Sequence, residues 1–348
     1  MNPGEGRVKS NVDNSLKNDD AQQASQAVTQ VIGVVPITTS VSVEADEQKE
    51  KEASGPKGSH DLGQSGIPKQ PDGSKSLGRP LITYAYSESA SARENLEFFI
   101  SQGLHDAADF IFILNGETDA ASLIPERDNI QTISRPNKCF DLGAHGEVLR
   151  QDDLWKKYKR FITLNASIRG PFIPYWAQRC WSDVFLSRVT NEVKLVGMTA
   201  NCLPQYHIQS MVWATDSIGM ELLLYPPPGS STPDKYGGAN DMVALEGCYK
   251  NMHKAVHGEI GATGLIQKAG YKVDALMAAF HKSGDYQMDC EREPVEDILW
   301  DRKYYGANVH PYETIFMKAN RDIDPTTVGL LTEWHLKGAF GGSWDICQ

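Results

Sequence analysis

Residues 81–116 read LITYAYSESASARENLEFFISQGLHDAADFIFILNG, and this stretch predicts the fold of the chain. The first six residues, LITYAY, are typical of a strand, and S-A-R-E at 91–94 is the capping-box pattern that opens a helix. Gly103 is placed to end that helix. The run 108–116 is apolar without alternation, as in a strand of a parallel sheet that is covered on both faces. The stretch therefore predicts a β-α-β unit.

The same alternation of strands and helices continues along the chain. Residues 130–134, 160–165, 194–198 and 208–214 are predicted strands, and the stretches between them include the helical patterns 141–150 and 152–160. Strands that alternate with helices predict an α/β fold with an open sheet. In such sheets the ligand lies beyond the carboxyl ends of the strands.

Composition divides the chain near residue 80. Residues 1–79 are rich in Ser, Gln, Lys, Glu, Gly and Pro, and such a segment buries too little apolar surface to offset its conformational entropy. We therefore predict a disordered N-terminal tail, 1–79, followed by one α/β domain, 80–348.

Charge and targeting signals limit the partners. The net charge is −11 and no Lys/Arg-rich cluster stands out, so a nucleic-acid partner is not expected. No signal peptide is visible, and the most apolar early stretch, 27–43, is too interrupted to span a membrane. These features predict a cytoplasmic protein, whereas an upstream anchor would place it in the Golgi or secretory lumen. The six cysteines are scattered, and we expect mostly buried thiols.

Four polar segments follow four predicted strands, at residues 86–89, 115–119, 135–144 and 165–172. The segment 135–144 is the most suggestive, because Asp141 can cap the helix that follows and Gly143 lets a ligand approach the backbone. A helix N-terminus at this place offers N–H groups to a phosphate. The alternative is a capped helix with small residues for packing.

Several common enzyme motifs are absent. The chain has no P-loop, no dinucleotide-binding glycine motif and no G-x-S-x-G elbow. His253 and His257 lie four residues apart without the Glu of a zinc protease, so a solvated helix face is expected for them.

Residues 81 to about 325 resemble glycosyltransferase-like proteins related to the rhamnan-synthesis protein F group. The resemblance rests on RPNKCFDLGAHGE (135–147), FITLNASIRGPF (161–172), HIQSMVWA (207–214), GATGLIQKAGY (261–271) and NVHPYETIF (308–316). It implies a GT-A-like fold, with an open mixed and mainly parallel sheet flanked by helices. It also implies the transfer of a hexosyl or deoxyhexosyl group from a nucleotide-sugar donor to a hydroxyl of a glycan or glycoconjugate acceptor.

The resemblance also suggests roles for individual residues. The donor-binding residues would be Tyr84, Tyr86, Ser87, Asn115, Asn137, Asp141, Gly143, Asn165 and Ser167. The acceptor-binding residues would be His207, Gln209, Ser210, His310 and Glu313. The catalytic candidates are Glu259 as first choice of base, Asp216 as second, and Arg169 as a cation for the leaving diphosphate. Glu259 is expected just before a helix, where the alternative is a carboxylate that only stabilises the helix start.

The sequence does not decide whether the reaction uses a metal ion. Asn165-Ala166-Ser167 falls where many GT-A enzymes carry a D-x-D motif, and both acids are missing. Mg²⁺ or Mn²⁺ held by other oxygens and a metal-independent reaction both remain alternatives. Two other functions also stay open: a catalytically silent carbohydrate- or nucleotide-binding scaffold on the same fold, and a hydrolase that uses His310 and Glu313.

Overall fold

The computed structural model describes residues 78–338 and 342–347. The predicted tail, 1–79, lies outside the described residues except for Gly78 and Arg79. Arg79 already belongs to the folded part, because its guanidinium donates to the carbonyl of Ala108 at 2.8 Å and pairs with Asp109.

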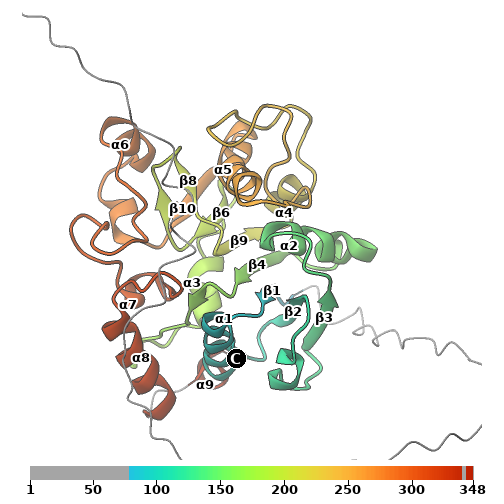
Figure 1. Cartoon of the computed structure of the whole chain (residues 1–348), viewed down its shortest axis with the longest axis vertical. Coiled ribbons are helices and arrows are strands. Elements are labelled where there is room, and N and C mark those ends of the chain that lie inside the picture. The colour runs from blue at the N-terminus through green and yellow to red at the C-terminus, as the bar shows by residue number, and fades with distance from the viewer. Residues whose placement is uncertain (1–77, 339–341, 348) are drawn as a thin grey trace, which may run out of the picture. The chain divides into compact units, whose positions relative to one another are not determined.

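A seven-stranded sheet forms the centre of the described region (Figure 1). Its order is β10-β6-β9-β4-β1-β2-β3. All neighbouring strands are parallel except where β9 meets β4 and β6, so β9 alone runs against the other six. The strands are β1 (Leu81–Ser87), β2 (Asp109–Asn115), β3 (Ile130–Arg135), β4 (Arg160–Asn165), β6 (Val193–Gly197), β9 (Val212–Asp216) and β10 (Lys272–Ala275). The predicted mixed, mainly parallel α/β sheet is confirmed.

Helices cover both faces of this sheet (Figure 1). On one face lie α2 (Asp141–Arg150), α4 (Ser217–Leu224) and α5 (Met252–Lys268). On the other lie α1 (Ala90–Gln102), α3 (Trp181–Leu186) and α8 (Pro325–Lys337). The remaining short elements are η2 (Ala120–Leu123), η3 (Gln151–Lys157), β5 (Ile168–Arg169), β7 (Ala200–Asn201), β8 (His207–Ile208), η4 (Ala278–His281), α6 (Tyr286–Arg292), α7 (Pro311–Thr314), β11 (Met317–Lys318) and α9 (Ser343–Ile346).

Strand β1 shows how the two faces are built. Successive side chains of a strand point to opposite faces. Tyr84 packs against Phe99 of α1, whereas its neighbour Thr83 bonds His145 of α2 at 2.9 Å. Burial lowers the pKa of His145 to about 4, so this histidine is neutral at pH 7 and acts as a hydrogen-bonding part of the core.

Local details differ from the sequence prediction in three places. Helix α1 begins at Ala90, and the capping side chain is Ser89, which accepts from the N–H of Ala92. The predicted strand 208–214 is two strands, β8 and β9. The polar stretch after α2 forms the 3-10 helix η3, not a continuing α-helix.

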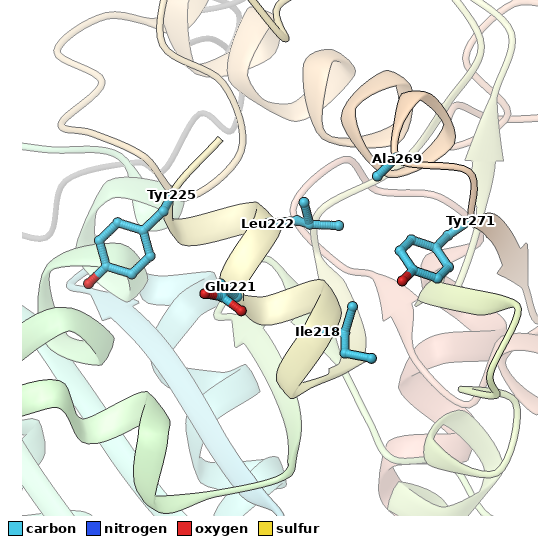
Figure 2. A pocket seen from close by; sticks show the side chains of 6 residues that line it. All are labelled: Ile218, Glu221, Leu222, Tyr225, Ala269 and Tyr271. Carbon is cyan, nitrogen blue, oxygen red and sulfur yellow. The ribbon is translucent and has the colours of Figure 1, made fainter. Parts of the chain in front are cut away.

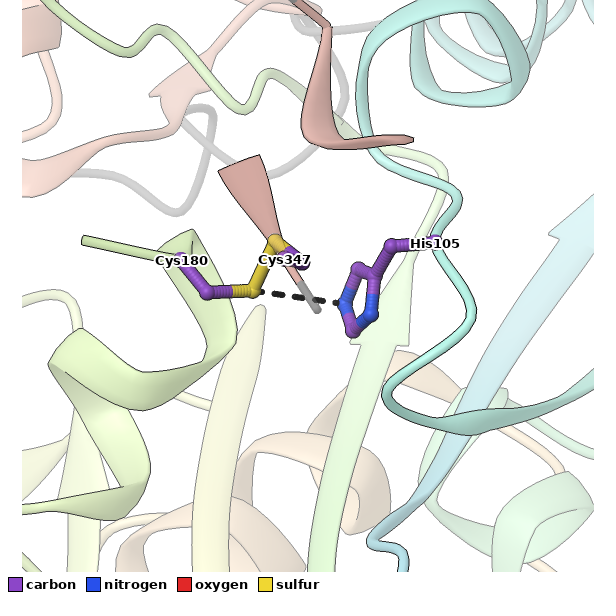
Figure 3. A group of neighbouring side chains, drawn as sticks. All are labelled: His105, Cys180 and Cys347. Carbon is purple, nitrogen blue, oxygen red and sulfur yellow. Dashed lines mark hydrogen bonds between the residues drawn. A yellow bond between two sulfur atoms is a disulfide. The ribbon is translucent and has the colours of Figure 1, made fainter. Parts of the chain in front are cut away.

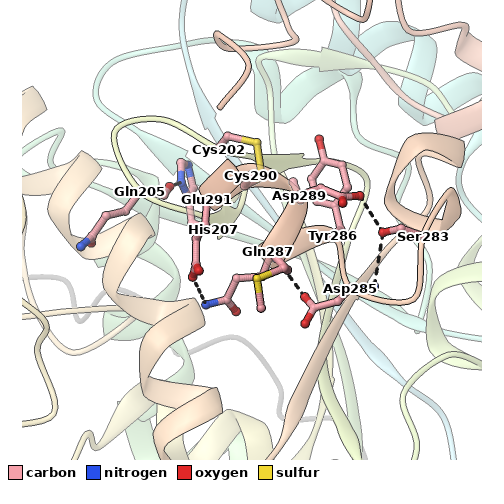
Figure 4. Close-up of a disulfide and its surroundings, with 12 residues drawn as sticks. Cys202, Gln205, His207, Ser283, Asp285, Tyr286, Gln287, Asp289, Cys290 and Glu291 are labelled. Carbon is pink, nitrogen blue, oxygen red and sulfur yellow. Dashed lines mark hydrogen bonds between the residues drawn. A yellow bond between two sulfur atoms is a disulfide. The ribbon is translucent and has the colours of Figure 1, made fainter. Parts of the chain in front are cut away.

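The prediction of buried thiols is wrong, because all six cysteines form disulfides. The pairs are Cys139–Cys248, Cys180–Cys347 and Cys202–Cys290, with sequence separations of 109, 167 and 88 residues. Each pair joins segments that are far apart along the chain and adjacent in space. Cys202–Cys290, for example, joins the loop after β7 to α6 (Figure 4).

None of the helices in the described part of the chain combines the length and apolarity needed to cross a bilayer.

Candidate functional site

The carboxyl ends of β4, β1, β2 and β3 meet at one edge of the sheet, because these four strands are parallel neighbours. The four polar segments predicted from the sequence follow these strands. This edge is the place where an α/β sheet of this kind binds its ligand.

A first group of polar side chains follows β1 and β2. Glu88 accepts hydrogen bonds from Tyr86 at 2.8 Å, from Arg93 at 2.7 and 3.0 Å, and from Thr118. The bonds from Arg93 and then Thr118 lower the pKa of Glu88 to about 2, so this carboxylate is charged at any physiological pH. Arg93 also pairs with Asp119. These contacts fix the loops at the ends of two neighbouring strands.

A second group connects β2 with β3. The Asn115 amide donates to the carbonyl of Tyr86 at 2.9 Å, and its oxygen accepts from Arg135 at 2.6 Å. Arg135 is buried and also pairs with Glu147 of α2. Asn137 donates to the Ser87 hydroxyl at 2.9 Å. Ser87 and Asn137 are exposed, as is Glu147, whereas Asn115 and Arg135 are buried.

A third group, which we call the strand-end cluster, surrounds the end of β4. It consists of Asp141, Asn165, Ser167, Ser210, Glu259 and Lys318. Asn165 donates to the Asp141 carboxylate and accepts from the backbone and hydroxyl of Ser167. The Ser167 hydroxyl in turn accepts from the Lys318 ammonium at 2.9 Å.

Glu259 reaches this cluster from the middle of α5, not from a helix start as predicted. Its Oε1 accepts a hydrogen bond from the N–H of Ser210. The next residue, Met211, accepts from the N–H of Asn165 at 3.2 Å through its carbonyl, which links Glu259 to the end of β4. The charges of Glu259 and Asp141 both act on Lys318. The alternative role of Glu259 in stabilising a helix start is therefore excluded by its position.

Asp216 lies away from the cluster. It ends β9, which runs antiparallel to β4, and it stands opposite Arg160 at the start of β4. Its carboxylate caps α4 through the N–H groups of Ile218 and Gly219 and pairs with buried Lys194. Asp216 is thus placed at the opposite edge of the sheet by the direction of its strand.

Three other predicted residues are in contact with other parts of the fold. Tyr84 is buried with its ring beside Phe99 and Phe112, and its hydroxyl has no hydrogen-bond partner among the described residues. The space over Gly143 is taken by the backbone of residues 247–248 and not left for a ligand. Arg169 pairs with Glu94 of α1 at 2.6 Å and donates to Asn95 at 2.9 Å, so its charge is already matched.

The predicted acceptor residues are divided between two places. Ser210 belongs to the strand-end cluster, and its neighbour Gln209 donates to Asp297. Asp297 also pairs with Arg321 at 2.6 Å. His207 is buried and bonds the carbonyl of Gln205. The N–H of Glu313 donates to the carbonyl of His310 at 2.9 Å, and no hydrogen bond joins their two side chains in the described region. His310 caps α7, and Glu313 accepts from the N–H of Ala278 and from Tyr304. The hydrolase alternative built on this pair gains no support from these contacts.

Lys318, Arg321 and Asp297 were not among the residues predicted from the sequence. Lys318 is brought to the cluster by β11, which pairs antiparallel with β5. Two-residue strands carry no periodic signal, so only the short apolar run before Lys318 hinted at this placement.

Another group has the connectivity of a catalytic triad. His257 Nδ1 lies 2.7 Å from Asp234 and Nε2 lies 3.0 Å from the Ser231 hydroxyl. The Ser231 hydroxyl also donates to the carbonyl of Gly238 at 2.9 Å, and the side chains of His257 and Asp234 are fully buried. His257 is therefore a buried anchor for the loop before α5, contrary to the predicted solvated helix face.

Two cavities lie elsewhere. One, of about 410 Å³, is lined by α4 and by Ala269 and Tyr271 after α5 (Figure 2). The other, of about 510 Å³, is lined by Lys282, Asp289 and Tyr305 among others. Its lining includes Cys202 and Cys290, whose disulfide is drawn in Figure 4. Neither includes a residue of the strand-end cluster. The convergence of polar groups at the sheet edge is a better indication of chemistry than the volume of these two hollows.

In the part of the chain that the structure describes, the strand ends bring together no group of three His, Cys, Asp or Glu ligand atoms. Among the described residues, His105, Cys180 and Cys347 bring three potential metal-ligand atoms close together (Figure 3). Both sulfur atoms there belong to one disulfide, so neither is a thiolate that could bind a metal. At the end of β4, the Asp141 carboxylate faces an amide and an ammonium lies at Ser167.

No family model and no curated protein matches the chain. Among solved structures it is similar to a mannosyltransferase from Pyrobaculum calidifontis in complex with GDP-Man and Mn²⁺, with 12% identity, 59% of this chain and 56% of that chain covered, and a TM-score of 0.35. It is also similar to a cytidylyltransferase from Leptospira borgpetersenii serovar Hardjo-bovis, with 11% identity, 42% of this chain and 63% of that chain covered, and a TM-score of 0.26. The chain spans less than two thirds of either structure. Both are transferases, and a likeness this distant assigns no substrate or metal to the chain.

Proposed function

We propose that this chain is a glycosyltransferase that moves a sugar from a nucleotide-sugar donor to a hydroxyl of a glycan or glycoconjugate. One observation carries the proposal: polar side chains from four neighbouring parallel strands form hydrogen-bonded groups along one sheet edge, and a carboxylate from α5 reaches the same place. Open α/β sheets bind their ligands beyond the carboxyl ends of their strands. The resemblance to the rhamnan-synthesis protein F group supports a hexosyl or deoxyhexosyl donor and a role in polysaccharide biosynthesis.

The position of each residue along the sheet edge suggests its role. Ser87 and Asn137 are exposed polar groups at the ends of β1 and β3, and they are suited to bind the nucleoside part of the donor. Asp141 and Asn165 lie at the end of β4, where sugar hydroxyls would reach them. Glu259 is the base in this proposal, because one carboxylate oxygen is held by the N–H of Ser210 and the group is only partly buried.

The silent scaffold on the same fold is the alternative that one observation favours. Asn165 donates a hydrogen bond to Asp141, so each side chain already has a partner before any ligand binds. A scaffold would bind nucleotide or sugar and release no product. Binding without turnover, unchanged in Glu259→Gln, would support the scaffold against the transferase.

A donor panel tests the proposal. We expect at least one nucleotide-sugar, among UDP-, GDP-, CDP- and dTDP-linked hexoses and deoxyhexoses, to raise the melting temperature. Ligands that bind only the folded state stabilise it by about 2.7 kcal/mol at one hundred times the dissociation constant. The shift is measured by differential scanning fluorimetry, with the free sugars as controls. No shift with any nucleotide-sugar or nucleoside diphosphate would contradict the proposal.

The disulfides favour an oxidising compartment for this reaction. Disulfides persist in secreted and luminal proteins and are rare in the cytosol, and here they pair all six cysteines. This supports the secretory lumen over the cytoplasmic location that the absence of a targeting signal suggested. Fractionation of the native protein in its own cells would distinguish the two.

A further inference from the structure

Lys318 carries a charge that the described residues do not match. Its ammonium lies at the end of β4 and donates to the Ser167 hydroxyl at 2.9 Å. Within the described part of the chain this is the one hydrogen bond that the ammonium makes, and no carboxylate oxygen lies within 4.0 Å of it. An ammonium has three N–H donors, so two of them find no acceptor there.

Other cations in this region are paired. Arg321 donates to Asp297 at 2.6 Å and to the carbonyl of Leu299, and its guanidinium lies over the Trp300 ring. Arg135 and Arg169 each have a carboxylate partner. Lys318 is half-buried, and charges that are partly withdrawn from water inside a protein are normally paired. The unpaired ammonium of Lys318 therefore indicates an anionic ligand that the chain itself does not supply.

The surroundings keep Lys318 charged at neutral pH while making it sensitive to alkali. Burial lowers the pKa of Lys318 to about 8, and the positive charge of Arg321 contributes in the same direction. The carboxylates of Glu259, Asp141 and Asp297 oppose this shift. The ammonium is thus mostly protonated at pH 7 and loses its charge as the pH rises through about 8.

The position of Lys318 also explains the missing D-x-D motif. Ser167 is the last residue of Asn165-Ala166-Ser167, the segment where the resemblance places a metal-binding pair of acids. In this chain the segment offers an amide and a hydroxyl, and the hydroxyl holds an ammonium. A cation covalently attached to the chain therefore lies where a divalent ion would otherwise be required.

We propose that the Lys318 ammonium binds the diphosphate of the nucleotide-sugar and neutralises the leaving group, so that the reaction needs no divalent metal. This rests on the proposed function. The bond between the anomeric carbon and the diphosphate oxygen breaks, and its electron pair stays on that oxygen. The acceptor oxygen bonds to the anomeric carbon and gives its proton to Glu259. Lys318 remains protonated and donates hydrogen bonds to the departing diphosphate.

The test is calorimetric titration of ADP, CDP, GDP, UDP and dTDP into the full chain, in EDTA and again with excess Mn²⁺. We expect at least one diphosphate to bind in EDTA with an affinity that Mn²⁺ changes by less than about threefold. Lys318→Met should weaken that binding about 10- to 100-fold, the usual range for a charge-assisted hydrogen bond. Lys318→Arg should restore most of it. The wild-type affinity should fall as the pH rises from 7 to 9.

Lys337→Met is the matched control, because Lys337 lies on α8 in an exposed ion pair with Glu333. Circular dichroism and urea unfolding of Lys318→Met check that it is folded; Lys318→Arg keeps the test valid if it is not. Binding that requires Mn²⁺, or that is unchanged in Lys318→Met, would overturn this inference and leave the proposed transferase intact. Absence of binding by any diphosphate or nucleotide-sugar, with and without Mn²⁺, would overturn both.

Discussion

Glu259→Gln is expected to lower kcat about 10²- to 10⁴-fold, the usual contribution of a general base. Glutamine keeps an oxygen that accepts from the N–H of Ser210, so the local structure and donor binding should survive. What it loses is the ability to take the proton of the attacking hydroxyl. The rate is measured as release of nucleoside diphosphate from the best donor of the panel, with water or a glycan as acceptor.

Glu333→Gln is the control for this substitution. Glu333 lies on the exposed side of α8 and pairs with Lys337, away from the strand-end cluster. It should leave both kcat and the affinity for the donor unchanged. A kcat of Glu259→Gln within about threefold of wild type would show that the carboxylate only supports the backbone of Ser210.

Reduction of the three disulfides is expected to unfold the domain. Removing a native disulfide costs about 2–5 kcal/mol, and the chain-entropy estimate for loops of about 100 residues lies near the upper end. The loops closed here span 88, 109 and 167 residues. The three together amount to on the order of 10 kcal/mol, which is comparable with the whole stability of a typical domain. Urea unfolding followed by tryptophan fluorescence, with and without reductant, measures the effect.

Two paired substitutions separate stability from function. Cys139→Ser with Cys248→Ser removes the link that holds residues 247–249 against the start of α2, beside Asp141. Cys180→Ser with Cys347→Ser removes a link between α3 and the segment after α9. Both should lose stability, and the first alone should also weaken donor binding. Alkylation of free thiols in the unreduced, denatured protein, detected by mass, would contradict the disulfide assignment.

The parts of the fold that the sequence predicted are those with strong local signals. Uninterrupted apolar runs such as 109–115 and 160–165 became buried strands, and β1 to β4 are the neighbours that the β-α-β alternation indicated. The reversed direction of β9 was not predictable, because strand direction depends on what lies next to it in the sheet. The disulfides were missed for the same reason: partners 88 to 167 residues apart leave no local pattern.

The site was predicted in part, through the rule that ligands bind at strand ends. Glu259 was placed before a helix because the glycines around it suggested a loop. The structure gives these glycines another reason: a side-chain carbon at Gly258 would meet the Tyr249 ring at 2.5 Å, and one at Gly261 would meet Val243 at 2.3 Å. Close packing, and not a turn, requires them within α5. Lys318 was missed because it reaches the cluster through a pairing 150 residues away.

Hydrogen–deuterium exchange with and without the best-binding nucleotide-sugar tests the central claim most directly. Exchange slows where a ligand covers backbone amides or stabilises local structure. Ligand binding at the strand ends predicts slower exchange at the carboxyl edge of the sheet, in peptides covering 84–88, 115–119, 135–143 and 165–169. Peptides that line the two cavities, 218–225 and 282–293, should not change. Protection confined to those cavity peptides, with the strand ends exchanging as before, would contradict it.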